Sequence, residues 1–231
     1  MDIRKGSDIK CNNDNIICLN EQSWYIFYPV IVLPEIRIHL LKNEILKNLP
    51  DVKIESDSLY IHIRGGDIFL DKPHSVYAQP PFCFYDKILY NNKFQNIYII
   101  SMDKENIIIS CLMNKYNNII FNRSSLEYDI SLLAHAYNIV LSVSTFSFSS
   151  IKLNDNLKDL WEYDIMHLYQ KIRFLHHQFY NFKINYRIHR MKPSDIYISK
   201  MYSWKRTYEQ VKLMIEEECP FDFVTIYPKI I

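Results

Sequence analysis

Glycine is scarce in this chain. Only 3 of its 231 residues are glycine, whereas an average sequence of this length would hold roughly 16. Two of the three, Gly65 and Gly66, stand side by side in SLYIHIRGGD (58–67). In so glycine-poor a chain the pair indicates a position where no side chain is tolerated. That is either a plain turn after a strand or a close approach of the backbone to a ligand.

Strong charge and long apolar runs are also missing. The formal net charge is +1, which argues against a general nucleic-acid or acidic-membrane partner. The apolar run WYIFYPVIVL covers only 10 residues and contains Pro29, so it is too short to cross a bilayer. The polar N-terminus does not resemble a signal peptide. We therefore expect no membrane segment in this chain.

Metal-binding patterns are absent from the sequence. The 5 cysteines (Cys11, Cys18, Cys83, Cys111 and Cys219) form no CxxC pair, and the histidines form no HExxH motif. We therefore expect no metal site. For the cysteines we expect buried free thiols, with a Cys11–Cys18 disulfide as the alternative in an oxidising compartment. The sequence leaves the redox compartment open.

Short apolar runs alternate with amphipathic segments from residue 58 onward. Strands are expected over 59–64, 96–101, 118–122 and 138–142, and helices over 82–90, 104–116, 125–137 and within 144–153. This alternation predicts an α/β fold, a Rossmann-like parallel sheet with helices on both faces. Further helices are expected over 34–50, 163–182 and 207–219. The predicted division is an N-terminal segment, 1–57, and a sheet domain, 58–231.

Polar residues gather where three of the predicted strands end. In an open parallel sheet, ligands bind beyond the carboxyl ends of the strands. The residues expected there are Arg64, Gly65, Gly66 and Asp67 after the first strand, Asp103 after the second, and Ser142, Ser144, Thr145 and Ser147 after the fourth. One guanidinium, two carboxylates and several hydroxyls would thus meet at one edge.

Arg64 is the centre of this predicted site. His62 and Arg64 share one face of the strand, and a planar guanidinium suits a pair of phosphates. The glycines would let the backbone approach a diphosphate closely. The chain has no Asp-x-Asp sequence that could hold a metal, so Arg64 would have to replace a metal's charge. The structural alternative is that Arg64 pairs with Asp67 and only fastens a loop.

Two further segments also admit two interpretations. Asp103 could bind a ribose hydroxyl or a guanine edge, or could cap the helix that starts at residue 104. The stretch STFS (144–147) could cradle an anion at a helix start, or its hydroxyls could simply cap that helix.

IHIRGGD (61–67) resembles the His-x-Arg-x-x-Asp motif of the fucosyltransferase superfamily, which includes α-1,2-, α-1,6- and protein O-fucosyltransferases. YIISMD (98–103) and VSTFS (143–147) are similar to two other motifs of that group. YAQPPFCFY (77–85) and NDNLKDLWEYD (154–164) resemble signatures of one of its branches. The likeness runs from about residue 20 to the end. Many relatives carry Arg-Arg where this chain has Arg64 and Gly65.

The resemblance implies the donor-binding half of a GT-B glycosyltransferase, with GDP-fucose as donor and inversion without a metal. Arg64 would hold the β-phosphate of GDP and offset charge on the leaving group. His62 and Asp103 would lie near the guanosine. Thr145, Phe146 and Ser147 would line the donor pocket. Asp67 would brace the loop, with a role as base left open.

The resulting hypothesis is transfer of fucose from GDP-fucose to a hydroxyl of a glycan or glycoprotein acceptor. The first alternative is a non-catalytic protein that binds GDP-sugar or glycan, because the strand–helix repeats build only one Rossmann-like half. The second is a purely structural α/β domain. Localisation stays open, because eukaryotic relatives work in the Golgi or endoplasmic reticulum lumen and bacterial ones need no anchor.

Overall fold

The structure is a computed structural model that describes residues 42–73, 78–164, 185–201 and 203–227. The chain divides into two compact units, residues 1–48 and 49–231. In the first unit the described residues form a short helix over 42–47. The predicted helix 34–50 is therefore confirmed over 42–47, although it ends earlier than predicted. Its first part lies outside the described residues.

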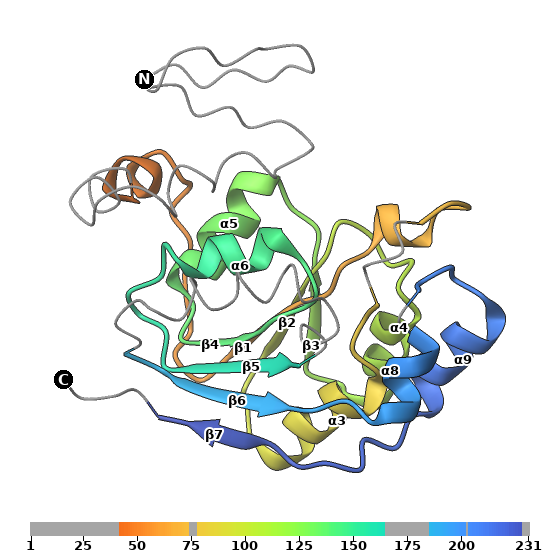
Figure 1. Cartoon of the computed structure of the whole chain (residues 1–231). Helices are drawn as coiled ribbons and strands as arrows, with labels where there is room; N and C mark the ends of the chain where they lie inside the picture. The colour runs from red at the N-terminus through yellow and green to blue at the C-terminus, as the bar shows by residue number, and fades with distance from the viewer. Residues whose placement is uncertain (1–41, 74–77, 165–184, 202, 228–231) are drawn as a thin grey trace, which may run out of the picture. The chain divides into compact units, whose positions relative to one another are not determined.

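The second unit is built on one seven-stranded sheet (Figure 1). The strands are β1 (Leu59–His62), β2 (Ile97–Ile100), β3 (Ile119–Asn122), β4 (Asn138–Val140), β5 (Asp159–Tyr163), β6 (Arg187–Met191) and β7 (Val224–Ile226). Their order is β3-β2-β1-β4-β5-β6-β7. All neighbouring pairs are parallel except β6 with β7. The first six strands thus follow the order 3-2-1-4-5-6 of a Rossmann-like fold.

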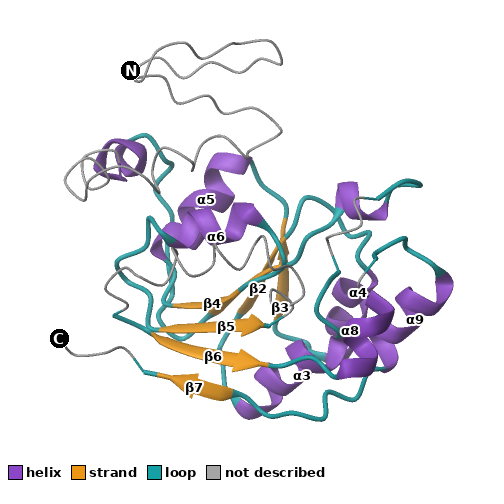
Figure 2. Ribbon diagram, in the orientation of Figure 1, coloured by secondary structure: helices purple, strands orange, loops and turns teal. Residues whose placement is uncertain are grey.

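Helices cover both faces of this sheet (Figure 2). They are α3 (Phe82–Asn91), α4 (Ile107–Lys115), α5 (Leu126–His135), α6 (Thr145–Ile151), α8 (Asp195–Met201) and α9 (Tyr208–Glu216), and a short 3-10 helix, η1 (Gly66–Phe69), follows β1. The predicted α/β class, with a parallel sheet between two helical layers, is confirmed.

Two separate hydrophobic clusters form the core, one on each face of the sheet. Alternate residues of a strand point to opposite faces, so Leu59 and Ile61 of β1 join one cluster and Tyr60 joins the other. The first cluster contains apolar residues of α3, α4, α8 and α9. The second contains Leu132 and Leu133 of α5. Each strand of the sheet centre is therefore buried on both sides.

The prediction for the chain beyond residue 158 was incomplete. Strands β5, β6 and β7 were missed, and Tyr163, which was predicted to begin a helix, is the last residue of β5. The rest of the predicted helix 163–182 lies outside the described residues, apart from Asp164, which follows the strand. The helix predicted over 207–219 is confirmed as α9, which Thr207 opens with a capping box.

The prediction of buried free thiols was wrong for two cysteines. Cys83 in α3 and Cys219 after α9 form a disulfide that joins positions 136 residues apart in the sequence. Cys111 is a free cysteine. Cys11 and Cys18 lie outside the described residues.

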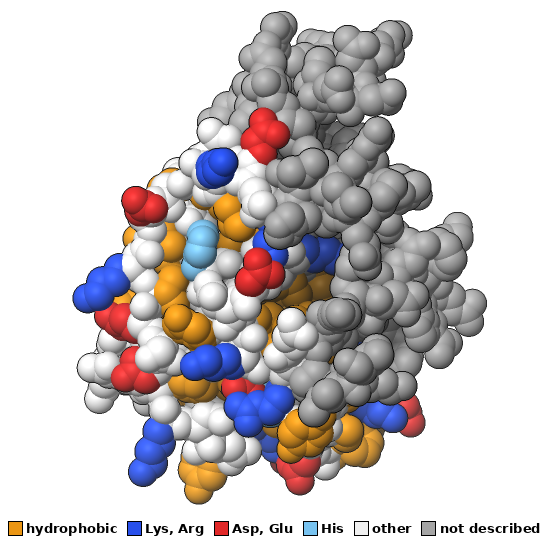
Figure 3. Space-filling view, turned by 90° about the vertical axis from the view of Figure 1, so that its left-hand side faces the viewer, with side chains coloured by type: hydrophobic (Ala, Val, Ile, Leu, Met, Phe, Trp, Pro, Cys, Tyr) orange, Lys and Arg blue, Asp and Glu red, His pale blue; other side chains and the backbone are white. Residues whose placement is uncertain are grey.

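The face of the molecule in Figure 3 carries Lys and Arg side chains interspersed with Asp and Glu side chains, in keeping with the small net charge. None of the described helices is both long and apolar enough to span a membrane.

Candidate functional site

The strand order reverses between β1 and β4, and this switch point positions the candidate site. The two strands are hydrogen-bonded neighbours, with Ile61 opposite Val140. The chain leaves β1 toward β2 on one side, and leaves β4 toward β5 on the other. The segments that follow the two strands therefore lie at the position where doubly wound sheets bind ligands. They contain the Arg64–Asp67 loop and the Ser144–Ser147 segment.

Arg64 and Asp67 form a two-pronged ion pair at this edge. Arg64 Nε donates to Asp67 Oδ1 at 3.1 Å, and Arg64 Nη2 donates to Oδ2 at 2.5 Å. The Arg64 side chain is 17% exposed and that of Asp67 53%. This is the internal pairing given above as the structural alternative. It also fixes the plane of the guanidinium, because a bidentate pair specifies orientation as well as proximity.

The two glycines make room for side chains from the loop that follows β2. A Cβ on Gly65 would lie 2.4 Å from Asp103 Oδ1, and a Cβ on Gly66 would lie 2.1 Å from Met102 Cε. Gly66 also has a φ of +56°, in the left-handed region. The left-handed turn thus requires glycine at position 66, whereas at position 65 it is the nearby Asp103 side chain that leaves no space for a Cβ. The close approach of a diphosphate remains a prediction.

This geometry predicts different effects of alanine at the two positions. Gly66→Ala should lower the free energy of unfolding by about 1–2 kcal/mol, because alanine is strained at a left-handed φ. Gly65→Ala should cost less, since its φ of −119° suits any residue and the Asp103 carboxylate can swing away. Urea unfolding of both variants measures the difference. Equal stability losses would contradict this account of the turn.

Asp103 lies beside the glycine pair, but it does not cap the following helix. The N-cap of α4 is Asn106, whose side-chain oxygen accepts from Ile108 N at 3.1 Å. Asp103 Oδ1 instead accepts from the backbone N–H of Glu105 at 2.9 Å. The structure therefore rules out the N-cap role and leaves the predicted role in nucleoside binding untested.

Asn106 was missed by sequence reasoning, although it ties the first two loops of the site together. Its Nδ2 donates to the backbone carbonyl of Arg64 at 3.0 Å. The signal that could have found it is the N-cap preference for Asn just before the apolar run of α4. Nearby, the buried Ser101 Oγ has no hydrogen-bond partner in the part of the chain that the structure describes. A Cβ on Gly65 would lie 3.2 Å from it.

His62 joins the two strands of the switch point. Its Nδ1 lies 2.6 Å from Ser142 Oγ, which follows β4. Its ring is tilted against that of Phe146 at 5.1 Å between centroids. Burial, with a smaller contribution from the Arg64 guanidinium, lowers the pKa of His62 to about 3. The imidazole is therefore neutral at physiological pH, and its position next to Arg64 adds no second positive charge.

The buried neutral His62 makes stability depend on pH. In the unfolded chain this histidine has a pKa near 6.5, so below that pH the unfolded state binds a proton that the folded state excludes. Stability should therefore fall as the pH falls from about 6.5 toward 3. The loss from His62 should reach about 2 kcal/mol at pH 5. His62→Asn, whose side-chain oxygen can take the place of Nδ1, should remove this part of the slope in urea unfolding at pH 7 and 5. An unchanged slope would contradict the buried, neutral assignment.

The hydroxyls of the predicted anion cradle are largely used within the helix start. Ser144 is the N-cap of α6, and its Oγ accepts from Phe146 N at 3.2 Å. The buried Ser147 donates back to the carbonyl of Ser144 at 3.2 Å. The helix-cap interpretation is thus confirmed for Ser144, whereas contact of this segment with an anion remains a prediction. For Thr145 the structure gives the backbone position at the start of α6, and its side chain is not described.

A charged cluster beyond the switch point was also missed. Arg190 of β6 pairs with Glu162 of β5, and its Nε lies 4.0 Å from Asp164 Oδ2. Both carboxylates are buried. They line a small cavity with Ser142, Val143 and Phe148, with room for about one water molecule. Sequence reasoning could not find this cluster because it did not recognise β5 and β6 as strands.

The predicted site residues are therefore partly brought together. The Arg64–Asp67 loop, Asp103 and His62 meet around the ends of β1 and β2, and His62 connects this group to Ser142 and Phe146. Among the described residues, no group of three or more His, Cys, Asp or Glu side chains is arranged to hold a metal ion. Comparisons of the chain with protein-family models, with curated proteins and with solved structures found no match.

Proposed function

We propose that the sheet domain binds the diphosphate of a nucleotide sugar at the β1–β4 switch point and uses Arg64 in place of a metal. The observation that carries this proposal is the position of Arg64. Arg64 follows the central strand β1 next to the switch point, and Asp67 fixes the plane of its guanidinium. Asp103 and the neutral His62 lie close to the same loop. The sequence motifs favour GDP-fucose as the donor.

In the proposed reaction an acceptor hydroxyl attacks the anomeric carbon of fucose. The bond between that carbon and the β-phosphate oxygen breaks, and GDP leaves with the electron pair. The anomeric configuration inverts, and the proton of the hydroxyl passes to a base. Arg64 would offset the charge that develops on the leaving diphosphate, which is electrostatic stabilisation of the transition state. No metal takes part.

Asp67 is better placed to orient Arg64 than to act as the base. Both of its carboxylate oxygens accept hydrogen bonds from the Arg64 guanidinium. An incoming diphosphate would either extend this pair or exchange with Asp67. In both cases the carboxylate determines where the arginine stands before the donor binds.

A non-catalytic GDP-sugar- or glycan-binding protein is the second candidate. It is favoured by one observation, since the strands of the described residues form one sheet, whereas the GT-B fold implied by the resemblance uses two Rossmann-like halves. Both candidates share the diphosphate site. They differ in whether an acceptor hydroxyl or water can reach the anomeric carbon.

Release of GDP from GDP-fucose separates the two candidates. The purified chain is incubated with GDP-fucose in EDTA, with and without a mixture of glycan acceptors, and GDP is measured over time. Transfer or hydrolysis above the level of an Arg64→Ala control supports the enzyme. Binding of GDP-fucose without release of GDP supports the non-catalytic protein, and absence of binding contradicts both.

A further inference from the structure

The segment that connects α8 and α9 contacts the η1 turn, which contains Asp67. The indole Nε1 of Trp204 donates to the backbone carbonyl of Ile68 at 2.7 Å. Its ring meets Phe69 edge-on at 5.9 Å between centroids. Trp204 is fully buried. The carbonyl that follows Asp67 in the chain is thus fixed by a side chain from 136 residues away.

Arg206 holds the next residue of the same turn. Its Nη1 donates to the backbone carbonyl of Phe69. Its guanidinium also lies over the Phe69 ring, 5.8 Å from the centroid, a geometry in which a cation is attracted to the ring face. Two successive carbonyls of η1 are therefore bound by two side chains of one short segment, which we call the 204–206 clamp.

The clamp is itself firmly positioned. Gln210 of α9 donates to the carbonyls of Lys200 at 3.0 Å and Ser203 at 2.8 Å, and its Oε1 accepts from Lys205 N at 2.9 Å. Gln210 is buried. One glutamine thus fixes the loop on either side of Trp204.

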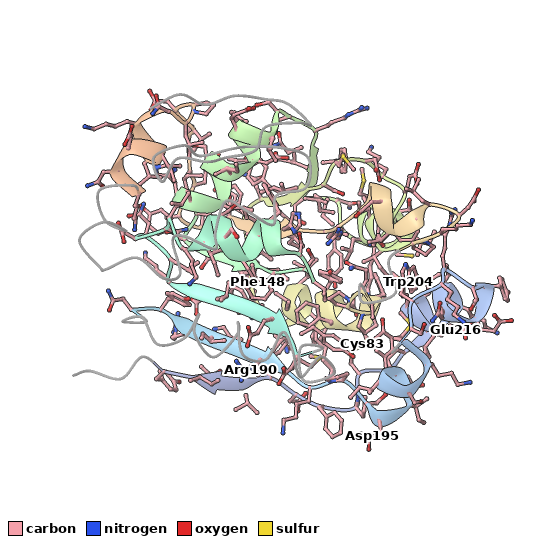
Figure 4. All side chains as sticks on the ribbon, turned by 45° about the horizontal axis from the view of Figure 1, so that its top comes forward. Cys83, Phe148, Arg190, Asp195, Trp204 and Glu216 are labelled. Carbon is pink, nitrogen blue, oxygen red and sulfur yellow. A yellow bond between two sulfur atoms is a disulfide. The ribbon has the colours of Figure 1, made fainter. Side chains whose placement is uncertain are left out.

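The segment from α8 to Cys219, which contains the clamp, is bound to other parts of the sheet domain at two further points. Tyr197 of α8 donates its hydroxyl to the carbonyl of Gln79 at 2.5 Å. Beyond α9, Cys219 is joined to Cys83 of α3 by the disulfide. Figure 4 shows Trp204 and Cys83 at the side of the molecule where α8 and α9 lie. The disulfide and the Tyr197 hydrogen bond therefore hold α8 and α9, between which the clamp lies, against the rest of the domain.

We infer that Trp204 and Arg206 are positioning residues for the anion site, and that they act through η1 on Asp67 and hence on Arg64. The steps are contiguous. The clamp binds the carbonyls of Ile68 and Phe69, Asp67 directly precedes Ile68, and Asp67 binds Arg64 through both oxygens. The inference rests on the proposed function for the identity of the ligand. The effect of the clamp on the order of the η1 turn can be measured without any ligand.

The alternative is that Trp204 only fills the core. The chain offers a matched comparison, because Trp161 is buried in the same hydrophobic cluster and its indole N–H makes no hydrogen bond within the described residues. The ring contacts that the structure gives for Trp161 are with Phe94 and His189, neither of which belongs to η1. Trp204→Phe and Trp161→Phe therefore remove similar volumes, and only the first removes a hydrogen bond to the turn.

The experiment compares the full-length wild type, Trp204→Phe and Trp161→Phe by two measurements. The first is amide hydrogen exchange of the segment 64–70 without ligand. The second is the affinity for GDP, titrated in EDTA. Loss of one buried hydrogen bond corresponds to a change of roughly 3- to 10-fold. We expect Trp204→Phe to speed exchange in 64–70 and to weaken GDP binding by about that factor, and Trp161→Phe to do neither.

The outcomes separate the clamp from the proposed function. Exchange in 64–70 that is equally slow in both variants overturns the clamp, whatever the affinities are. Faster exchange with unchanged GDP affinity overturns its role in positioning Arg64. If the wild type binds no GDP, the proposed function fails, and with it the role in an anion site. Faster exchange in Trp204→Phe alone would then still show that the clamp orders the turn.

Discussion

Arg64→Ala is expected to lower the affinity of the chain for GDP by about 100-fold, the largest effect of any single substitution at the site. Truncating one member of a hydrogen-bonded, largely desolvated charge pair typically costs about 2–5 kcal/mol of binding free energy. Arg64 is mostly buried and would be the cation that faces the diphosphate. Calorimetric titration with GDP in EDTA measures the loss.

Part of this loss could come from Asp67, which would remain as an unpaired carboxylate near the phosphates. The double variant Arg64→Ala/Asp67→Asn removes that repulsion. If Arg64 itself binds the diphosphate, the double variant should stay at least 10-fold weaker than the wild type. Recovery of full affinity would show that Arg64 served only to neutralise Asp67.

Arg187→Ala is the matched control for Arg64→Ala. Arg187 also pairs with an aspartate, its Nη2 lying 2.6 Å from Asp159 Oδ2. The pair stands at the opposite ends of the strands, since Asp159 and Arg187 are the first residues of β5 and β6. GDP affinity should be unchanged in Arg187→Ala. An equal loss in both variants would point to a general electrostatic effect and contradict a site at Arg64.

Removing the Cys83–Cys219 disulfide is expected to have the largest effect on stability. The bond joins residues 136 apart in the sequence, and a disulfide across a loop of that order stabilises a fold by about 5 kcal/mol, chiefly by restricting the unfolded chain. The variant Cys83→Ala/Cys219→Ala should therefore lose about that free energy of unfolding. Its melting temperature should fall by roughly 10 °C.

Urea unfolding of the wild type with and without a reductant gives an independent measure of the same quantity. Reduction should bring the wild type close to the double variant. Cys111→Ala is the control, because Cys111 is a free cysteine. The stability of this variant should fall with the reductant by the same amount as that of the wild type. A wild type that is indifferent to reductant would contradict the bond. Disulfides persist in oxidising compartments and are reduced in the cytosol. The difference in stability with and without reductant therefore measures how much stability the fold would lose in a reducing compartment.

The first part of the sheet could be predicted because its signals are local. The apolar strands β1 to β4 alternate with amphipathic helices, and Ser125 caps α5, as the preference for serine at a helix start would lead one to expect. The convergence of Arg64, Asp67 and Asp103 followed from strand polarity alone, since parallel strands bring their carboxyl ends to one edge. None of this required knowledge of distant contacts.

Strands β5 and β6 could not be predicted because their charged side chains pair with one another across the two strands. DLWEY and RIHRM do not read as apolar runs. In the sheet, however, Asp159 lies opposite Arg187 and Glu162 lies opposite Arg190, and each pair forms an ion pair. A charge that argues against a buried strand when read alone becomes acceptable once the neighbouring strand supplies its partner.

Two residues that support the candidate site, Asn106 and Trp204, were not predicted because their partners are backbone atoms. They donate hydrogen bonds to backbone carbonyls of the Arg64–Phe69 segment. Every residue has such a carbonyl, so the sequence does not indicate which one accepts the bond. The disulfide was hidden by distance, because 136 residues separate its cysteines and no spacing motif links them. The local N-cap preference marks Asn106 as the start of α4, but its bond to Arg64 and the other contacts depend on the folded arrangement.

The most direct test of the central claim is calorimetric titration of the purified wild-type chain with GDP in EDTA. The account predicts saturable binding without any metal, at one site per chain, that is lost in Arg64→Ala and kept in Arg187→Ala. Absence of binding by a folded wild type would contradict it. Arg64 and Asp67 would then be a structural ion pair, and Gly65 and Gly66 would serve only the turn that packs against Met102 and Asp103.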